Sequence, residues 1–195
     1  MSLQEINERH RQRVTQQLHL QQEVFVCGEG NQQPVMMLVG EAPGAQEVMQ
    51  GRPFVGKAGQ NLEHFLQKLH LQRSTHYISN VVKIRPCKVG PTGRLSNRPP
   101  TKTEIDIFLP WLLDEIAYLN PQAIVTLGNT ALQAILGPEY AIGAVHGQLI
   151  KRPDMPLIFP LYHPAAVIYN RELQSVYDAD LLRLSGLLAE RQATT

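Results

Sequence analysis

Apolar residues along the chain fall into two patterns. The first is a short continuous run that ends in a polar residue, glycine or proline, as expected for a buried strand that leaves a sheet. Such runs occupy residues 35–39, 77–82, 123–128 and 157–161. A further small edge strand is expected over Val24, Phe25 and Val26, ahead of the turn residues that follow them.

The second pattern has helical spacing and occurs between these runs. Leu62, Phe65, Leu66 and Leu69 follow one another at i, i+3, i+4 and i+7, which predicts an amphipathic helix. Thr101 and Glu104 have the spacing of a capping box, and an apolar stripe from Ile105 to Ile116 predicts a longer helix, in which Pro110 should cause a kink. Two more helices are expected over 129–136 and 172–190, and residues 1–23 predict a weak polar helix or arm.

Alternation of strands and helices favours right-handed crossovers and a parallel sheet. We therefore expect a three-layer α/β/α sandwich with a central, mostly parallel, four-stranded sheet. No internal repeat or linker divides the sequence, so residues 1–195 should form one domain. The carboxyl ends of parallel strands share one edge of the sheet, where Glu41, Asn80, Gly128 and His163 should meet.

Composition narrows the class of protein. A chain of 195 residues that is 43% hydrophobic can bury one core, and no apolar run approaches the roughly 20 residues of a membrane span. We therefore expect a cytoplasmic protein without membrane contact, and we expect it to act as a monomer. Two cysteines provide neither a disulfide framework nor, alone, a four-ligand metal site. The net charge of +1 means that any affinity for nucleic acid must come from a local patch.

The candidate site is the glycine-rich loop after the first main strand. Glycines allow the backbone to approach a ligand closely, and open α/β sheets bind ligands at the carboxyl ends of their strands. The loop contains Gly40-Glu41-Ala42-Pro43-Gly44 with Glu47, and then Gly51-Arg52-Pro53-Phe54-Val55-Gly56-Lys57-Ala58-Gly59.

Together with Tyr77-Ile78-Ser79-Asn80 and His163-Pro164-Ala165, this loop resembles the motifs of family 4 uracil-DNA glycosylases. The motifs occur in the order of that family, from about Val24 to about Arg171. The resemblance implies an enzyme that flips uracil out of DNA, hydrolyses its N-glycosidic bond and leaves an abasic site. It also implies Phe54 as the platform on which the base lies.

The chemistry of the remaining residues agrees with this resemblance. The Asn80 amide offers an acceptor for N3–H and a donor for O4 of uracil, a pattern that cytosine reverses. His163 can donate to O2, where negative charge develops as the bond breaks. The carbonyl of Ala42, helped by Glu41 or Glu47, is expected to orient the water. Glu47 could instead exclude thymine near C5, and both glutamates could simply bind loop amides.

DNA contacts are expected in two segments. Residues 81–103 contain no acidic residue. They contain six basic residues suited to phosphate contacts, namely Lys83, Arg85, Lys88, Arg94, Arg98 and Lys102. The resemblance implies that the loop after His163 enters the minor groove, with Val167 or Ile168 as an apolar wedge and Arg171 near a phosphate. Gly40 and Gly44 should let the backbone approach the base.

One departure from family 4 concerns its iron–sulfur cluster, which four cysteines hold in typical members. In this sequence His10 and Arg13 lie near the first pair, Ile84 takes the third position and Ile107 lies near the fourth. Cys27 and Cys87 fall elsewhere, so we expect no cluster and no metal, with apolar packing in its place. Two alternatives remain: a damage-binding module without catalysis, and a Rossmann-like enzyme that acts on a free nucleotide.

Overall fold

The computed structural model describes residues 1–192 and has a five-stranded sheet at its centre. The strand order is β1 (Glu29–Gly30), β3 (Tyr77–Asn80), β2 (Met36–Gly40), β6 (Ala123–Leu127) and β7 (Leu157–Leu161). The last four strands are parallel neighbours, whereas β1 is antiparallel to β3. All five residues of β2 and of β6 are buried, which explains their continuous apolar runs.

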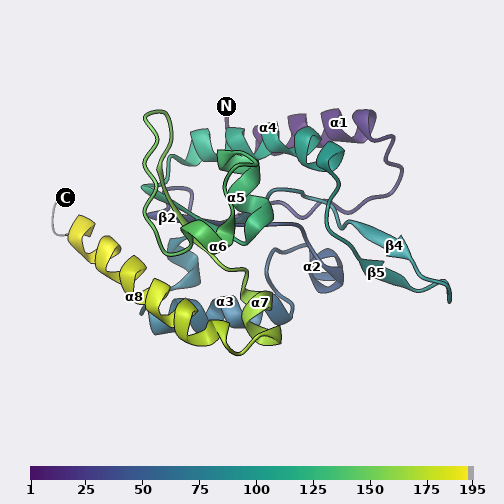
Figure 1. Cartoon of the computed structure of the whole chain (residues 1–195). Helices are drawn as coiled ribbons and strands as arrows, with labels where there is room; N and C mark the ends of the chain where they lie inside the picture. Colours follow the sequence, from purple (N-terminus) through teal and green to yellow (C-terminus); the bar gives the residue numbers. More distant parts are fainter. Residues whose placement is uncertain (193–195) are drawn as a thin grey trace.

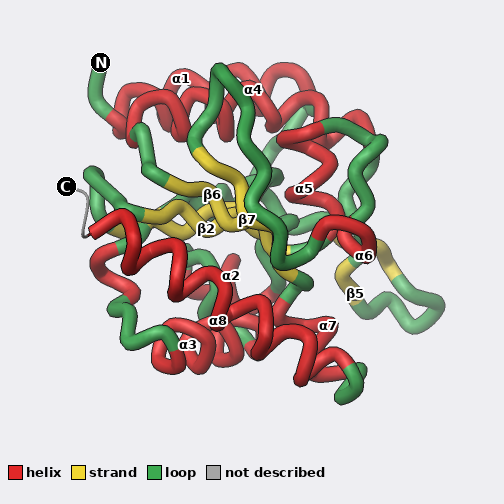
Figure 2. Tube along the Cα trace, turned by 60° about the vertical axis from the view of Figure 1, so that its left-hand side comes forward, coloured by secondary structure: helices red, strands yellow, loops and turns green. Residues whose placement is uncertain are grey.

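Helices cover both faces of this sheet, as Figures 1 and 2 show. One face carries α1 (Leu3–Gln17), α4 (Lys102–Leu119) and α5 (Asn129–Leu136), and the other carries α3 (Lys57–Lys68), α7 (Pro164–Tyr169) and α8 (Leu173–Gln192). Each face has its own apolar core, with Trp111 and Phe108 in the first and Phe65 and Leu184 in the second. The predicted three-layer sandwich is confirmed.

Short elements complete the chain. Helix α2 (Ala45–Gln50) lies inside the glycine-rich loop, a 3₁₀ turn (Arg73–Thr75) precedes β3, and α6 (Ile142–Val145) follows α5. Strands β4 (Cys87–Val89) and β5 (Leu95–Asn97) form an antiparallel hairpin that projects from the body in Figure 1. Within residues 1–192, no helix is long and apolar enough to cross a membrane.

Three local predictions need correction. The sheet has five strands and not four, because the edge strand is Glu29–Gly30. The segment 24–26 is no strand, although the Val26 amide donates to the Lys83 carbonyl over 2.7 Å. Residues 165–168, expected in a loop, lie in α7, which His163 caps and Pro164 begins. Proline suits this first helical position because its missing N–H would have no partner there.

The predicted capping box of α4 is confirmed. Thr101 Oγ1 accepts from the Glu104 amide, and the Glu104 carboxylate accepts from the Thr101 amide. The helix continues through Pro110 to Leu119. Its buried side carries Trp111 and Glu115, which places a carboxylate under the sheet behind β3.

Candidate active site

A cavity of about 570 Å³ opens at the carboxyl ends of the strands. Phe54, Asn80 and His163, which lie far apart in the sequence, all line it. Its other lining residues are Glu41, Ala42, Gly44, Ala45, Gln46, Glu47, Gly56, Lys57, Ala58, Asn97 and Ala165. The volume falls within the roughly 300–1,000 Å³ of small-molecule sites. The structure therefore brings the three predicted base-binding side chains together.

Phe54 is held in an unusual backbone conformation. Its φ of +52° lies in the left-handed region, which a bulky residue rarely adopts. The ring is buried, and its edge lies so close to Gly40 that a Cβ there would come within 2.4 Å of Phe54 Cζ and 2.5 Å of Asn80 Oδ1. Gly59 is equally constrained, because a Cβ on it would meet the Phe54 carbonyl. These two glycines are thus required for the position of the ring.

Two charged side chains secure the loop around Phe54. Glu47 accepts hydrogen bonds from the amides of Gly44, Val55 and Gly56, at 3.1, 3.0 and 2.7 Å. It is 9% exposed, so its carboxylate mainly organises the loop. This matches the alternative in which the glutamate binds loop amides.

On the other side of the loop, Arg73 donates to the carbonyls of Pro53 and Phe54 at 2.5 and 3.2 Å. The same guanidinium lies 2.9 Å from Glu29 in the edge strand β1, and Glu29 also pairs with Arg52. Hydrogen bonds and charge therefore connect the Phe54 backbone to the edge of the sheet. The sequence offered no signal for this link, because Arg73 lies outside every motif.

Asn80 ends β3 and is only 2% exposed. Strand residues alternate between faces, so Ser79 points toward α4 and Asn80 points into the cavity. Beyond the strand, Val81 and Val82 donate to the carbonyls of Gly40 and Glu41, at 2.9 and 3.0 Å. The end of β3 is therefore fixed against the start of the glycine-rich loop.

His163 caps α7, and its Nδ1 accepts a hydrogen bond from the Ala165 amide over 3.1 Å. In a neutral imidazole this leaves the proton on Nε2, which makes Nε2 a donor. Burial lowers the pKa of His163 from 6.5 to about 4. The side chain is therefore a neutral hydrogen-bond donor at physiological pH.

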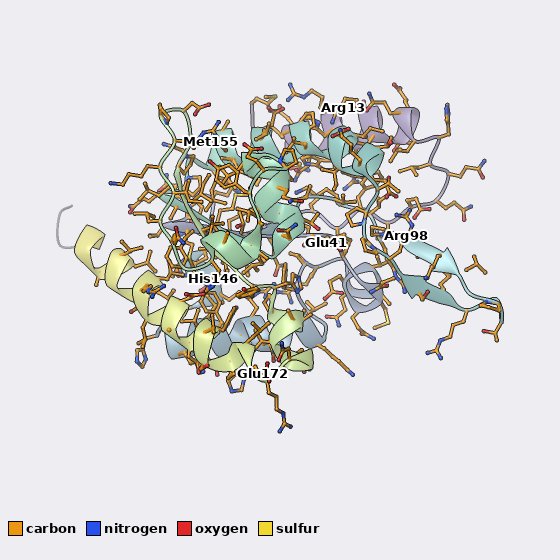
Figure 3. The ribbon with its side chains drawn as sticks, viewed as in Figure 1. Arg13, Glu41, Arg98, His146, Met155 and Glu172 are labelled. Carbon is orange, nitrogen blue, oxygen red and sulfur yellow. The ribbon has the colours of Figure 1, made fainter. Side chains whose placement is uncertain are left out.

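Glu41 and Ala42 follow β2 at the cavity wall. Glu41 Oε2 accepts a short hydrogen bond of 2.5 Å from Thr130 Oγ1 in α5, and Figure 3 shows Glu41 close to that helix. Within residues 1–192, no N–H or O–H group donates to the Ala42 carbonyl. A carbonyl of this kind can accept from a water molecule in the cavity.

The residues predicted to contact DNA differ in their exposure to solvent. Lys88 and Arg94 are exposed on the β4–β5 hairpin, and Arg171 and Ile168 are exposed near α7. Lys83, by contrast, is fully buried against Glu115, so it cannot reach a phosphate. Val167 is 7% exposed and packs in the core of the α3 and α8 face, which removes it as the wedge.

The other two arginines of the segment also have internal partners. Arg98 forms two hydrogen bonds of 2.7 Å with Glu104 and a third, of 3.2 Å, with the Cys87 carbonyl. It lies where the hairpin joins the body in Figure 3. Arg85 donates to Asn97 Oδ1 over 2.7 Å. These contacts support a role in shaping the hairpin, and they place Asn97, which the sequence analysis missed, at the rim of the cavity.

The region that holds an iron–sulfur cluster in typical family 4 members has no suitable donors. Arg13 donates to the carbonyl of Ile107 over 2.8 Å, and His10 stacks on Trp111 and bonds Asp114. The rings of Phe25, Phe108 and Trp111 pack together there, and Ile84 is buried. Cationic, aromatic and aliphatic groups replace thiolates, so these residues do not fit a cluster.

Neither cysteine changes this conclusion. Cys27 and Cys87 are free, and burial raises the pKa of the Cys27 thiol. Among residues 1–192, no group of three or more histidine, cysteine, aspartate or glutamate side chains is arranged to hold a metal ion.

The fold is an α/β sandwich whose sheet has, at its carboxyl edge, a cavity lined by Phe54, Asn80 and His163. Comparison with protein families matches residues 27–182 to the Uracil DNA glycosylase superfamily. The chain belongs to that superfamily. Within it, the chain is similar to type 4 members over nearly its whole length.

The type-4 uracil-DNA glycosylase of Thermotoga maritima is 36% identical over 186 residues, which cover 94% of this chain and 93% of the relative. That of Archaeoglobus fulgidus is 34% identical and covers 91% and 88%, respectively. The crystal structure of wild-type Pedobacter heparinus SMUG2 matches with a TM-score of 0.50 at 13% identity, over 83% of this chain and 76% of that one. This last similarity concerns the fold alone.

Proposed function

We propose that this chain is a monofunctional uracil-DNA glycosylase, a DNA repair enzyme that releases free uracil and leaves an abasic site. The observation that carries the proposal is the convergence of Phe54, Asn80 and His163 on one cavity. The type-4 relatives, at 34% to 37% identity, support it independently.

The substrate base must leave the duplex before it can enter the cavity. In the proposed complex, uracil lies on the Phe54 ring, and stacking on an aromatic side chain contributes about 1–3 kcal/mol per base. The Asn80 amide pairs with N3–H and O4. A cytosine in this position would leave buried polar groups unpaired, at a cost of about 1–3 kcal/mol each.

Bond cleavage moves negative charge onto the uracil ring. His163 Nε2–H donates to O2 and stabilises this charge, and the neutral imidazole does so without giving up its proton. The Ala42 carbonyl accepts from the attacking water, and Glu41, oriented by Thr130, favours the cationic character of the sugar. The Glu47 carboxylate contributes by holding the loop that carries Phe54.

DNA is the proposed macromolecular partner. Lys88 and Arg94 on the hairpin and Arg171 beside α7 are the candidates for phosphate contacts. Ile168, 41% exposed on α7, is the candidate wedge. We propose a monomeric, single-domain enzyme, in which one sheet and the helices on its two faces carry the whole cavity. The two free cysteines support a cytoplasmic location, where thiols stay reduced.

We also propose that the enzyme works without an iron–sulfur cluster, since the residues in that region do not fit one. The test is the iron and acid-labile sulfide content of protein purified without oxygen, measured beside uracil release. Full activity in protein whose iron content lies far below one atom per chain would agree with the proposal. Stoichiometric iron that is lost together with activity would contradict it.

The assay that tests the function is release of free uracil from labelled single-stranded and double-stranded oligonucleotides. Asn80→Ala and His163→Ala should both abolish most of the release. Ala42 lacks a polar side chain, which favours a second candidate, a module that binds damaged DNA without cleaving it. Tight binding of uracil-containing DNA by the wild type, with no release, would select that module.

A further inference from the structure

Lys83 and Glu115 form a completely buried ion pair behind the candidate site. Lys83 Nζ lies 2.6 Å from Glu115 Oε2, 2.6 Å from Ser79 Oγ and 2.7 Å from the Asn80 carbonyl oxygen. Both charged side chains are 0% exposed. An ammonium group has three N–H donors, and each of these three oxygens takes one. Ser79 Oγ in turn donates to Glu115 Oε2 over 2.9 Å.

The peptide group that follows Asn80 is therefore fixed at both ends. Its carbonyl accepts from Lys83 Nζ, and its N–H, which belongs to Val81, donates to the Gly40 carbonyl over 2.9 Å. Strand β3 ends at Asn80, so the lysine replaces the strand partner that this carbonyl lacks. A displacement of this peptide group would shift the Asn80 Cα and, with it, the side chain.

The two faces of β3 contact different parts of the protein. Lys83, Ser79 and Glu115 lie on the face toward α4, while the Asn80 amide lies on the cavity face. On that face, Asn80 Oδ1 lies directly over Gly40, close to the edge of the Phe54 ring. A small change in the Asn80 backbone would move this oxygen into Gly40 or away from a bound base.

We propose that the Lys83–Glu115 pair is a positioning unit for Asn80. It holds the Asn80 peptide in the orientation that directs the amide toward N3–H and O4 of uracil, and it never touches the base. The proposal rests on the proposed function, because it assigns Asn80 the task of reading uracil.

Stability alone gives a weak reason for such a pair. Desolvation of two buried charges offsets most of their attraction, and well-packed apolar residues of similar volume often replace buried pairs without loss. An apolar pair, however, cannot donate to the Asn80 carbonyl. Stability and positioning can therefore be separated by substitution.

The test compares Lys83→Met with the double variant Lys83→Met and Glu115→Met. The single variant leaves the Glu115 carboxylate buried and unpaired, so it should lower Tm strongly. The double variant should recover most of that Tm. Its single-turnover rate of uracil release, with enzyme in excess, should nevertheless stay at least about tenfold below wild type, the factor expected for one hydrogen bond. Its preference for uracil over cytosine should also fall.

Leu119→Ala is the matched control. Leu119 is buried in the same helix, one turn after Glu115, and lines no part of the candidate site. Removal of the leucine side chain should leave a cavity that lowers Tm, and the rate of uracil release should stay unchanged below the unfolding temperature. A double variant with recovered Tm, wild-type rate and wild-type base preference would overturn the positioning role.

A second readout separates this proposal from the proposed function. The side-chain amide of Asn80, assigned by NMR in the protein without DNA, should give one sharp pair of resonances in wild type. In the double variant this pair should shift and broaden. Unchanged resonances overturn the positioning role whether or not uracil is released. No release by a wild-type protein with ordered Asn80 resonances would overturn the proposed function instead.

Discussion

The Phe54 ring lies against the His163 imidazole, with 6.0 Å between the ring centroids and 30° between the ring planes. The proposed base platform and the proposed donor to O2 therefore pack against each other. They come from distant parts of the chain, the glycine-rich loop and the end of β7. In the proposed complex, a base stacked on Phe54 would lie beside the His163 imidazole.

Phe54→Ala should lower kcat/KM for uracil release by about fivefold to about 160-fold, because the stacking of roughly 1–3 kcal/mol is lost. The measurement is steady-state kinetics on a uracil-containing oligonucleotide. Phe25→Ala serves as the control, since Phe25 packs on Phe108 and Trp111, on the other face of the sheet. Equal losses of activity in the two variants would mean that only folding was affected.

The pKa of His163 predicts how activity depends on pH. Because the folded-state pKa is about 4, the imidazole stays neutral above about pH 5, and the rate should not change with its protonation between about pH 5 and 8. His163→Asn keeps an N-cap residue at the start of α7 but removes the Nε2 donor. This variant should fold and lose most of its activity. A wild-type rate that falls below a midpoint near pH 6.5 would contradict the assignment.

The same pKa affects stability. The unfolded chain takes up a proton on His163 below about pH 6.5, whereas the folded chain does so only near 4, so acid favours unfolding. The free energy of unfolding should fall as the pH decreases from about 6.5 to about 4, and then level off for this group. Urea unfolding of wild type and His163→Asn at several pH values measures this pH dependence. The contributions of the other histidines cancel when the free energies of unfolding of the two proteins are subtracted.

Glu47→Gln should act mainly through the loop. The carboxylate accepts from three amides, and a glutamine has only one oxygen with which to accept. We expect a loss of about 1–3 kcal/mol in the free energy of unfolding, together with lower activity. Glu41→Gln should retain its bond to Thr130 and its stability. A Glu47→Gln protein with wild-type Tm but no activity would show that the carboxylate acts in catalysis.

The hairpin should contribute phosphate contacts. Lys88→Ala and Arg94→Ala should each weaken DNA binding and reduce the slope of log K against log salt by about 1. Arg98→Ala should instead lower Tm, because this guanidinium binds Glu104 and the Cys87 carbonyl. Binding isotherms at several salt concentrations make the comparison. An unchanged slope in both hairpin variants would place the phosphate contacts elsewhere.

The strands and long helices could be predicted because burial gives them clear patterns. Strand β2 is an uninterrupted apolar run, and α3 repeats its buried residues at i, i+3 and i+4. The β4–β5 hairpin could not be found in this way, since Val89 and Leu95 are both exposed and mark no buried face. Helix α7 could have been predicted from the sequence, because Pro164, at the first helical position, follows the N-cap residue His163.

The convergence of Phe54, Asn80 and His163 on one cavity was predictable, because motifs contain all three residues. Lys83 was not, because a lysine in a run of cations resembles a solvated one until its partner is known. That partner, Glu115, lies 32 positions later in α4 and reaches Lys83 only through the packing of the helix on the sheet. Arg73 poses the same difficulty, since its contacts with Pro53, Phe54 and Glu29 depend on the folded chain.

Arg73 connects the partly exposed Glu29 of β1 to the carbonyl of Phe54. A substitution of Glu29 would therefore alter the setting of the aromatic platform without changing any group that contacts the substrate. Protein engineers who wish to accommodate a bulkier lesion could begin at this carboxylate, which lies outside the cavity.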